Sequence, residues 1–197
     1  MPSPALPGLF FAFAAAVLLL FASVTPPAWD KYGFLEVTSG AATTVFGVFG
    51  TCIRGGACTK HHVGYPLEAQ GVSVDMNTSI LHNLTYTFIL HPIAGGLAFL
   101  AFLFGILGVG AASRVGTILM SVCAFFGTLA AVVVFVIDMV VWNVLHNRLT
   151  SSNVPSSLGI ANWLTAGAVA ALLLSTCTGM CGSCGRFATG RMAGEKY

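Results

Sequence analysis

Charged residues are scarce in this sequence. Asp, Glu, Lys and Arg make up 7% of its 197 residues, whereas 56% are hydrophobic. Soluble domains carry about 25% charged residues, so this composition excludes an ordinary water-soluble core. The net charge is only +2, and the basic residues are too scattered to form the stripe that a nucleic-acid-binding protein needs. We therefore expect a membrane protein that does not bind nucleic acid.

Catalytic signatures are also absent. The sequence contains no metalloprotease helix, nucleophile elbow, phosphate-binding glycine loop or kinase signature. We therefore expect that the protein is not an enzyme and needs no cofactor. A transporter is an alternative, but the apolar segments offer little polar material for a transport path.

Basic residues are missing from the start of the chain as well. The first apolar run spans about residues 9–24, and Pro26 and Pro27 end it because proline cannot continue a helical hydrogen-bond ladder. A cleaved signal peptide begins with a positively charged region, whereas residues 1–8 contain no Lys or Arg. This pattern favours a retained membrane anchor, with a signal peptide as the alternative.

Three further apolar runs follow, at about residues 84–109, 115–142 and 158–178. A bilayer core takes about 20 helical residues, so each run is long enough to cross it. The short link between the second and third runs forces an antiparallel hairpin. The sequence therefore predicts an all-α membrane protein, a single tetraspan domain over residues 1–197 with a four-transmembrane-helix bundle. Small residues that favour close helix packing recur four positions apart: Ala12/Ala16, Ala94/Ala98, Gly127/Ala131 and Gly167/Ala171.

The orientation in the membrane is not settled by basic residues, because equal numbers lie on the two sides. Asn77 and Asn83 each begin an N-glycosylation sequon. With the cysteine pair described next, the sequons predict that residues 25–83 form an extracellular loop. Asn77 is the better acceptor, because Asn83 lies beside the second span. Residues 143–157 then form a short extracellular loop, residues 179–197 a cytoplasmic tail, and both termini are cytoplasmic.

The long loop is rich in β-branched and aromatic residues, which predicts two to four short strands. Cys52 and Cys58 flank a Gly-Gly pair that suits a tight turn, so we predict a disulfide that closes a small β-rich domain. A zinc site made of these cysteines with His61 and His62 is the alternative. Adjacent histidines in an extended segment face opposite sides, and we therefore expect no metal.

Two titratable residues lie inside apolar runs, and such residues need a partner or a function. At 1.5 Å per residue, His91 lies about 10 Å and Asp138 about 6 Å below the outer ends of their helices, so they can meet as an intramembrane polar pair. Pro92 lacks a donor and frees a carbonyl near Phe88, which predicts a kink and a polar spot at the same depth. The pair either fixes helix register or senses protons, and Asp138 alone could instead reach the interface.

The ends of the apolar runs carry residues typical of membrane interfaces. Trp142 and Trp163 are interpreted as interface anchors. At the inner end of the fourth run, Cys177, Cys181 and Cys184 have the spacing of one helical face. Cysteines in this position are candidates for palmitoylation, and the alternative is that they are unmodified thiols.

Several segments together resemble the fungal PalI family, within a claudin-like set that includes the eisosome tetraspan proteins. They are Phe46–Cys52 with Cys58 and Gly64–Tyr65, Ile89–Ala94, Phe135–Asp138 and Asn162–Thr165. Trp29 and Gly47–Phe49 are also similar to a claudin pattern, but Phe49 replaces its second Trp, so barrier function is not expected. The resemblance implies a non-catalytic plasma-membrane protein that assists an ambient-pH receptor or organises a membrane domain.

These observations predict an accessory subunit that binds another integral membrane protein, a receptor or a membrane enzyme, and stabilises or localises it. The alternative is an organiser of membrane microdomains that acts through lipid contacts and self-association as a homo-oligomer. A partner present in fixed ratio distinguishes the first function from the second.

Overall fold

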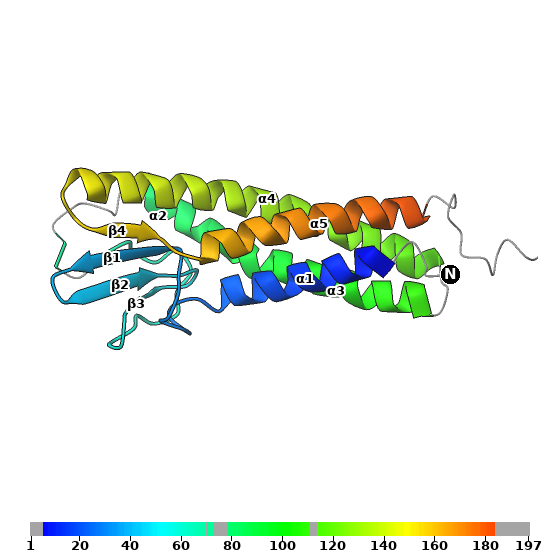
Figure 1. Ribbon diagram of the computed structural model, residues 1–197, viewed down its shortest axis with the longest axis horizontal. Helices are drawn as coiled ribbons and strands as arrows, with labels where there is room; N and C mark the ends of the chain where they lie inside the picture. Colours follow the sequence, from blue (N-terminus) through cyan, green and yellow to red (C-terminus); the bar gives the residue numbers. More distant parts are fainter. Residues whose placement is uncertain (1–5, 70, 73–78, 111–113, 184–197) are drawn as a thin grey trace, which may run out of the picture. The chain divides into compact units, whose positions relative to one another are not determined.

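The computed structural model describes residues 6–69, 71–72, 79–110 and 114–183. Among these residues, four helical stretches are long and apolar enough to cross a membrane: Leu6–Ser23, Ser79–Gly110, Val115–Ser151 and Ala161–Met180. The elements in chain order are α1 (Leu6–Ser23), β1 (Leu35–Ser39), β2 (Ala42–Phe46), β3 (Thr51–Ile53), α2 (Ser79–Thr85), the 3-10 helix η1 (Tyr86–Ile89), α3 (Leu90–Gly110), α4 (Arg114–Ser151), β4 (Ser156–Leu158) and α5 (Ala161–Ser183) (Figure 1). The predicted fold class, four apolar helices with a small disulfide-closed sheet, is confirmed.

The chain forms two compact units. One, here called the helical unit, comprises residues 1–19, 93–131 and 167–197. The other, here called the sheet unit, comprises residues 20–92 and 132–166. Each unit has a core of its own, and each of the four long helices contributes residues to both.

The helical unit is packed through small residues. Its fully buried alanines let neighbouring helix backbones approach closely, and they include Ala12, Ala15, Ala94, Ala98, Ala101, Ala124, Ala131 and Ala168. Where α3 and α4 meet, a Cβ built on Gly116 would lie 2.6 Å from the backbone nitrogen of Gly108, so glycine is required there. Hydroxyl groups also join the helices, because Ser175 Oγ donates to the carbonyl of Gly8 at 2.9 Å.

The sheet unit contains an antiparallel sheet with the strand order β3-β2-β1-β4. Gly40, with φ of +59°, lies in the tight turn between β1 and β2, where a left-handed conformation favours glycine. Strand β4 comes from the connection between α4 and α5 and pairs with β1, with Leu35 opposite Leu158. The sheet therefore combines both segments that were predicted to be extracellular loops.

Residues 143–157 differ from the predicted loop. Helix α4 continues to Ser151, and residues 156–158 form β4. The extension is helical because Trp142, Leu145 and Leu149 lie on one face and are fully buried in the same core as β1 residues Leu35 and Val37. The fourth span therefore begins at Ala161 rather than near residue 158.

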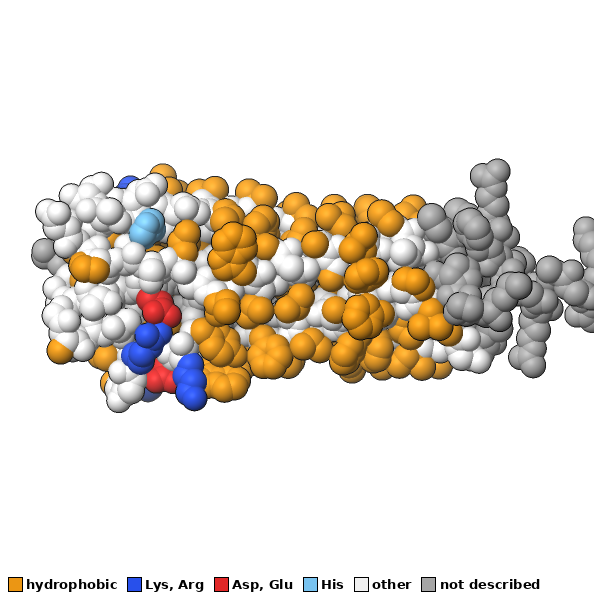
Figure 2. Space-filling view, in the orientation of Figure 1, with side chains coloured by type: hydrophobic (Ala, Val, Ile, Leu, Met, Phe, Trp, Pro, Cys, Tyr) orange, Lys and Arg blue, Asp and Glu red, His pale blue; other side chains and the backbone are white. Residues whose placement is uncertain are grey.

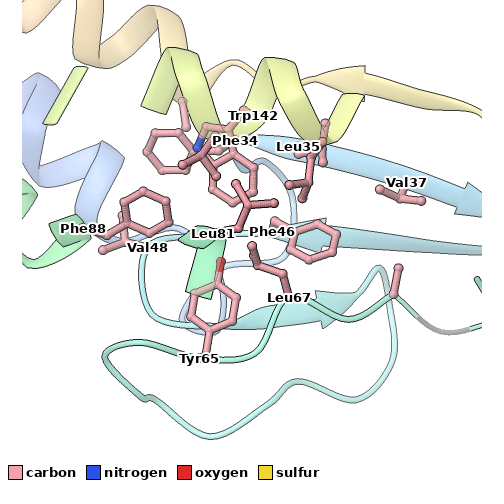
Figure 3. Packing of buried hydrophobic residues seen from close by; sticks show 14 of the residues in the cluster. Phe34, Leu35, Val37, Phe46, Val48, Tyr65, Leu67, Leu81, Phe88 and Trp142 are labelled. Atoms are coloured by element: carbon pink, nitrogen blue, oxygen red, sulfur yellow. The ribbon is translucent and has the colours of Figure 1, made fainter. Parts of the chain in front are cut away.

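Aromatic side chains fill the centre of the sheet-unit core. Figure 3 shows Phe34, Phe46, Phe88 and Trp142 gathered close together. Trp142 stacks on Phe88 with ring centroids 5.5 Å apart and on Phe34 at 5.8 Å. The interpretation of Trp142 as an interface anchor was wrong, because its side chain is fully buried. Trp163, by contrast, is 74% exposed.

Charged side chains tie the disulfide loop to the segment that follows α1. Arg54 donates to the Glu36 carboxylate at 2.6 Å and to the carbonyl of Lys31 at 3.3 Å. The backbone N–H of Gly55 donates to Asp30 Oδ2 at 3.0 Å. Figure 2 shows such acidic and basic side chains side by side, whereas hydrophobic side chains cover the exposed faces of the helices.

Candidate functional site

The intramembrane polar pair predicted from the sequence lies inside the sheet unit. His91, at the second position of α3, and Asp138, in α4, are both fully buried. The distance from His91 Nε2 to Asp138 Oδ2 is 3.0 Å. The structure therefore brings the two residues into hydrogen-bond contact, and Asp138 does not reach the surface of the protein.

Pro92 helps to explain why a histidine stands at this position. Proline has no N–H to donate to the carbonyl four residues earlier, which here belongs to Phe88. His91 Nδ1 lies 3.1 Å from that oxygen. Because a carbonyl oxygen only accepts hydrogen bonds, Nδ1 must carry a proton. The polar spot expected near Phe88 is thus occupied by the imidazole ring itself.

The hydrogen bonds fix how many protons the pair holds. With Nδ1 protonated, the contact between Nε2 and Asp138 Oδ2 needs one further proton between them. Thr165 Oγ1 lies 3.4 Å from Nε2, but its hydroxyl already donates to the carbonyl of Ala161 at 3.1 Å, so it can only accept. The pair therefore shares one proton and has no net charge, which suits burial in an apolar environment.

The pair is enclosed by residues that sequence reasoning did not place there. The ring of Phe34 packs edge-on against His91, with centroids 5.2 Å apart. Trp142 lies one helical turn after Asp138, and within the described residues neither Asp138 Oδ1 nor Trp142 Nε1 has a hydrogen-bond partner. The only sequence signal for Trp142 was its i, i+4 spacing from Asp138, which places both on one helical face.

Phe34 links the pair to the sheet. It immediately precedes β1, and its carbonyl accepts hydrogen bonds from Asn162 Nδ2 and from the backbone of Gly159, both at 2.8 Å. A Cβ on Gly159 would collide with the carbonyl of Gly33, so this contact requires glycine. Asn162 and Thr165 belong to the Asn162–Thr165 segment noted for its family resemblance, and the structure shows that both pack around Phe34 and His91.

The disulfide joins Cys52 of β3 to Cys58, with their Cα atoms 4.0 Å apart. Backbone hydrogen bonds from Ile53 to Ala57 and from Thr59 to Thr51, both 2.9 Å, pair the two sides of this hairpin. The bond consumes both thiols and so removes them from the alternative zinc ligand set. Nearby, Tyr65 donates its hydroxyl proton to the carbonyl of Gly47 at 2.6 Å, and burial raises the pKa of that hydroxyl.

The predicted modification sites are only partly visible. Asn83 is exposed on α2, and Thr85 of the same sequon is buried, with its hydroxyl donating to the carbonyl of His82 at 2.7 Å. Cys177 is exposed on α5. Asn77, Cys184 and the side chain of Cys181 lie outside the described residues.

Comparison with known proteins decides the family. Residues 4–178 match the SUR7/PalI family. The chain belongs to the SUR7/PalI family. It is therefore a non-catalytic, multi-pass tetraspan membrane protein. A search of curated proteins finds no match to this SUR7/PalI protein.

Proposed function

We propose that this SUR7/PalI protein is an accessory subunit that binds another integral membrane protein and stabilises or localises it. It acts in the plasma membrane, with the sheet outside the cell and both termini in the cytoplasm. The partner is a receptor or membrane enzyme, as in ambient-pH sensing.

The observation that carries this proposal is the connection between the sheet and the buried pair. Phe34 contacts the His91 ring on one side and hydrogen bonds the start of α5 on the other. Four elements, α3, α4, α5 and the segment before β1, thus meet at one point, where His91, Asp138 and Thr165 are all fully buried. Such an arrangement supports a rigid binding platform, because residues held by packing and hydrogen bonds lose little freedom on association.

We assign His91 and Asp138 to fixing helix register rather than to proton sensing. A pair that shares one proton and is fully buried is neutral, and any gain or loss of a proton would leave an isolated charge in an apolar core. The single bridging hydrogen bond specifies how α3 and α4 align, since a shift of either helix would leave two buried polar groups unpaired.

Purification from native membranes in mild detergent, followed by mass spectrometry, tests the accessory function. The proposal expects one integral membrane protein in fixed ratio with the wild-type chain, and a loss of stability or correct localisation of that protein when the chain is deleted. Homo-oligomers or lipid-rich clusters without a second protein would instead support the microdomain organiser.

A further inference from the structure

The exposed face of α4 changes from apolar to polar within the sheet unit. Val140 and Val144 are exposed, and about one turn later the exposed residues are Asn147 and Arg148. The buried face of the same helix stays apolar as far as Leu149. A change confined to the exposed face is typical of a helix that leaves the hydrocarbon core of a bilayer.

The chain that leads into α3 shows the same change. Asn83 is exposed on α2, and the exposed residues that follow are the large apolar side chains of Tyr86 and Ile89. Ile80, which is exposed before Asn83, is a single apolar residue among polar neighbours, as occurs on water-exposed surfaces. The surface of this segment therefore becomes apolar between Asn83 and Tyr86.

The two remaining chain segments change at an exposed tryptophan. At the start of α5, exposed Ser157 is followed by exposed Ile160 and Trp163. After α1, the last exposed apolar side chain is that of Trp29, and Lys31 is exposed two residues later. All four segments thus pass once between an apolar and a polar surface.

The two exposed tryptophans belong to neighbouring segments. The rings of Trp29 and Tyr32 are in contact, with centroids 5.4 Å apart. The next residue, Gly33, accepts a hydrogen bond at its carbonyl from the backbone N–H of Ala161 at 3.1 Å. Trp163 follows Ala161 in the first turn of α5. The aromatic side chains therefore gather where the surface changes its character.

The chemistry of these residues suits the headgroup layer of a membrane. Tryptophan and tyrosine combine an apolar ring with a polar tip, and they are enriched at membrane interfaces. A lysine can keep its apolar stem among such rings while its ammonium group reaches lipid phosphates. Lys31 is exposed in this place, whereas the carboxylate of Asp30 accepts a hydrogen bond from the N–H of Gly55.

We propose that Trp29, Tyr32 and Trp163 lie in the lipid headgroup layer of the membrane surface nearest the sheet. Lys31 contacts lipid phosphates there, and the sheet rests directly on this surface. The occupant is lipid because the apolar surface below the tryptophans continues along the four candidate spans. The inference goes beyond the proposed function, since it concerns lipid and needs no protein partner.

The same boundary gives the depth of the buried pair. Asp138 lies six residues before Val144 in α4, which is about 9 Å along the helix axis. Half of a bilayer core is about 15 Å thick. The pair of His91 and Asp138 therefore lies between the boundary and the bilayer midplane, and the last turns of α4 stand outside the membrane.

Quenching of tryptophan fluorescence in lipid nanodiscs that hold the full chain alone tests this placement. The quenchers are phospholipids brominated near the headgroup, phospholipids brominated near the chain ends, and iodide in the water. Trp29→Phe reports on Trp163, Trp163→Phe reports on Trp29, and the double variant keeps only Trp142. We expect Trp29 and Trp163 each to lose most fluorescence to the lipid brominated near the headgroup.

Trp142 is the matched control, because its fully buried side chain should respond least to all three quenchers. Loss of Trp29 or Trp163 fluorescence mainly to iodide would place that side chain in water, and loss mainly to chain-end bromine would place it in the hydrocarbon core. Either result would overturn the proposal. An equal response of Trp142 would do the same, because lipid would then not distinguish the exposed indoles.

A second matched pair of variants locates the boundary on α4. Val140 and Asn147 are both exposed and lie seven residues apart, on one helical face. In the double Phe background, Val140→Trp should lose fluorescence to brominated lipid, whereas Asn147→Trp should lose it to iodide. The same response at both positions would show that the boundary does not lie between them and that the proposal is wrong. The accessory function, which requires a partner, is tested separately by copurification.

Discussion

Substitution of Asp138 tests how the buried pair is built. Asp138→Asn places an amide donor opposite the lone pair of His91 Nε2, so one hydrogen still bridges the two side chains. Asp138→Ala removes the partner and leaves a fully buried nitrogen without a hydrogen bond. A buried polar group that loses its partner costs about 1–3 kcal/mol, and hydrogen bonds between membrane helices are worth at most about 1.7 kcal/mol.

We therefore expect Asp138→Ala to lower the free energy of unfolding by about 1–3 kcal/mol. For a chain of this size, that corresponds to a fall in Tm of about 2–12 °C. Asp138→Asn should lower the free energy of unfolding by about 1 kcal/mol or less, because one hydrogen bond to His91 remains. Thermal unfolding in nanodiscs, followed by circular dichroism, measures both, with Val136→Ala on the exposed face of α4 as the control. Equal destabilisation by Asn and Ala would refute the neutral, single-proton arrangement.

Three further predictions concern the disulfide, the two tryptophans Trp142 and Trp163, and the two sequons. The double variant Cys52→Ser with Cys58→Ser should lower the free energy of unfolding by only about 2 kcal/mol, because the loop that the disulfide closes is small. The hairpin should persist, because its backbone hydrogen bonds remain. Complete loss of the β-sheet signal in infrared spectra would contradict this expectation. Trp142→Ala should lower the free energy of unfolding by about 3–5 kcal/mol, whereas Trp163→Ala, at an exposed position, should lower it by less than about 0.5 kcal/mol. Similar shifts in Tm for the two variants would refute the assigned burial. Asn77→Gln, but not Asn83→Gln, should remove a glycosidase-sensitive shift in gel mobility; the reverse result would reject the preference for Asn77.

Much of the helical architecture was predictable from the sequence because it depends on length and local chemistry. Long apolar runs ended by prolines or polar turns marked the spans, and the alanines four positions apart are buried in the helical unit. The contact between His91 and Asp138 could also be predicted. The two residues lie at similar depths in neighbouring helices, and Pro92, next to His91, frees a carbonyl at that depth. These signals act within one helix or between two neighbouring helices.

The parts that were missed depend on contacts between distant segments. Strand β4 contains only three residues, two of them serine, and is a strand because it pairs with β1 far earlier in the chain. The end of α4 also depends on distant contacts. It stays helical beyond Trp142 because Leu145 and Leu149 pack in the sheet-unit core. Propensity alone cannot reveal such partners, since tertiary packing decides the outcome.

Cysteine cross-linking between β1 and β4 tests most directly the central claim that both loop segments build one sheet on the same side of the membrane. Val37 and Ser156 are directly opposite in the register. Val37→Cys with Ser156→Cys should therefore form a disulfide in the purified protein. The control, Val37→Cys with Ser157→Cys, should not, because a one-residue shift moves the side chain to the other face. Equal cross-linking of both pairs, or none in either, would contradict the account.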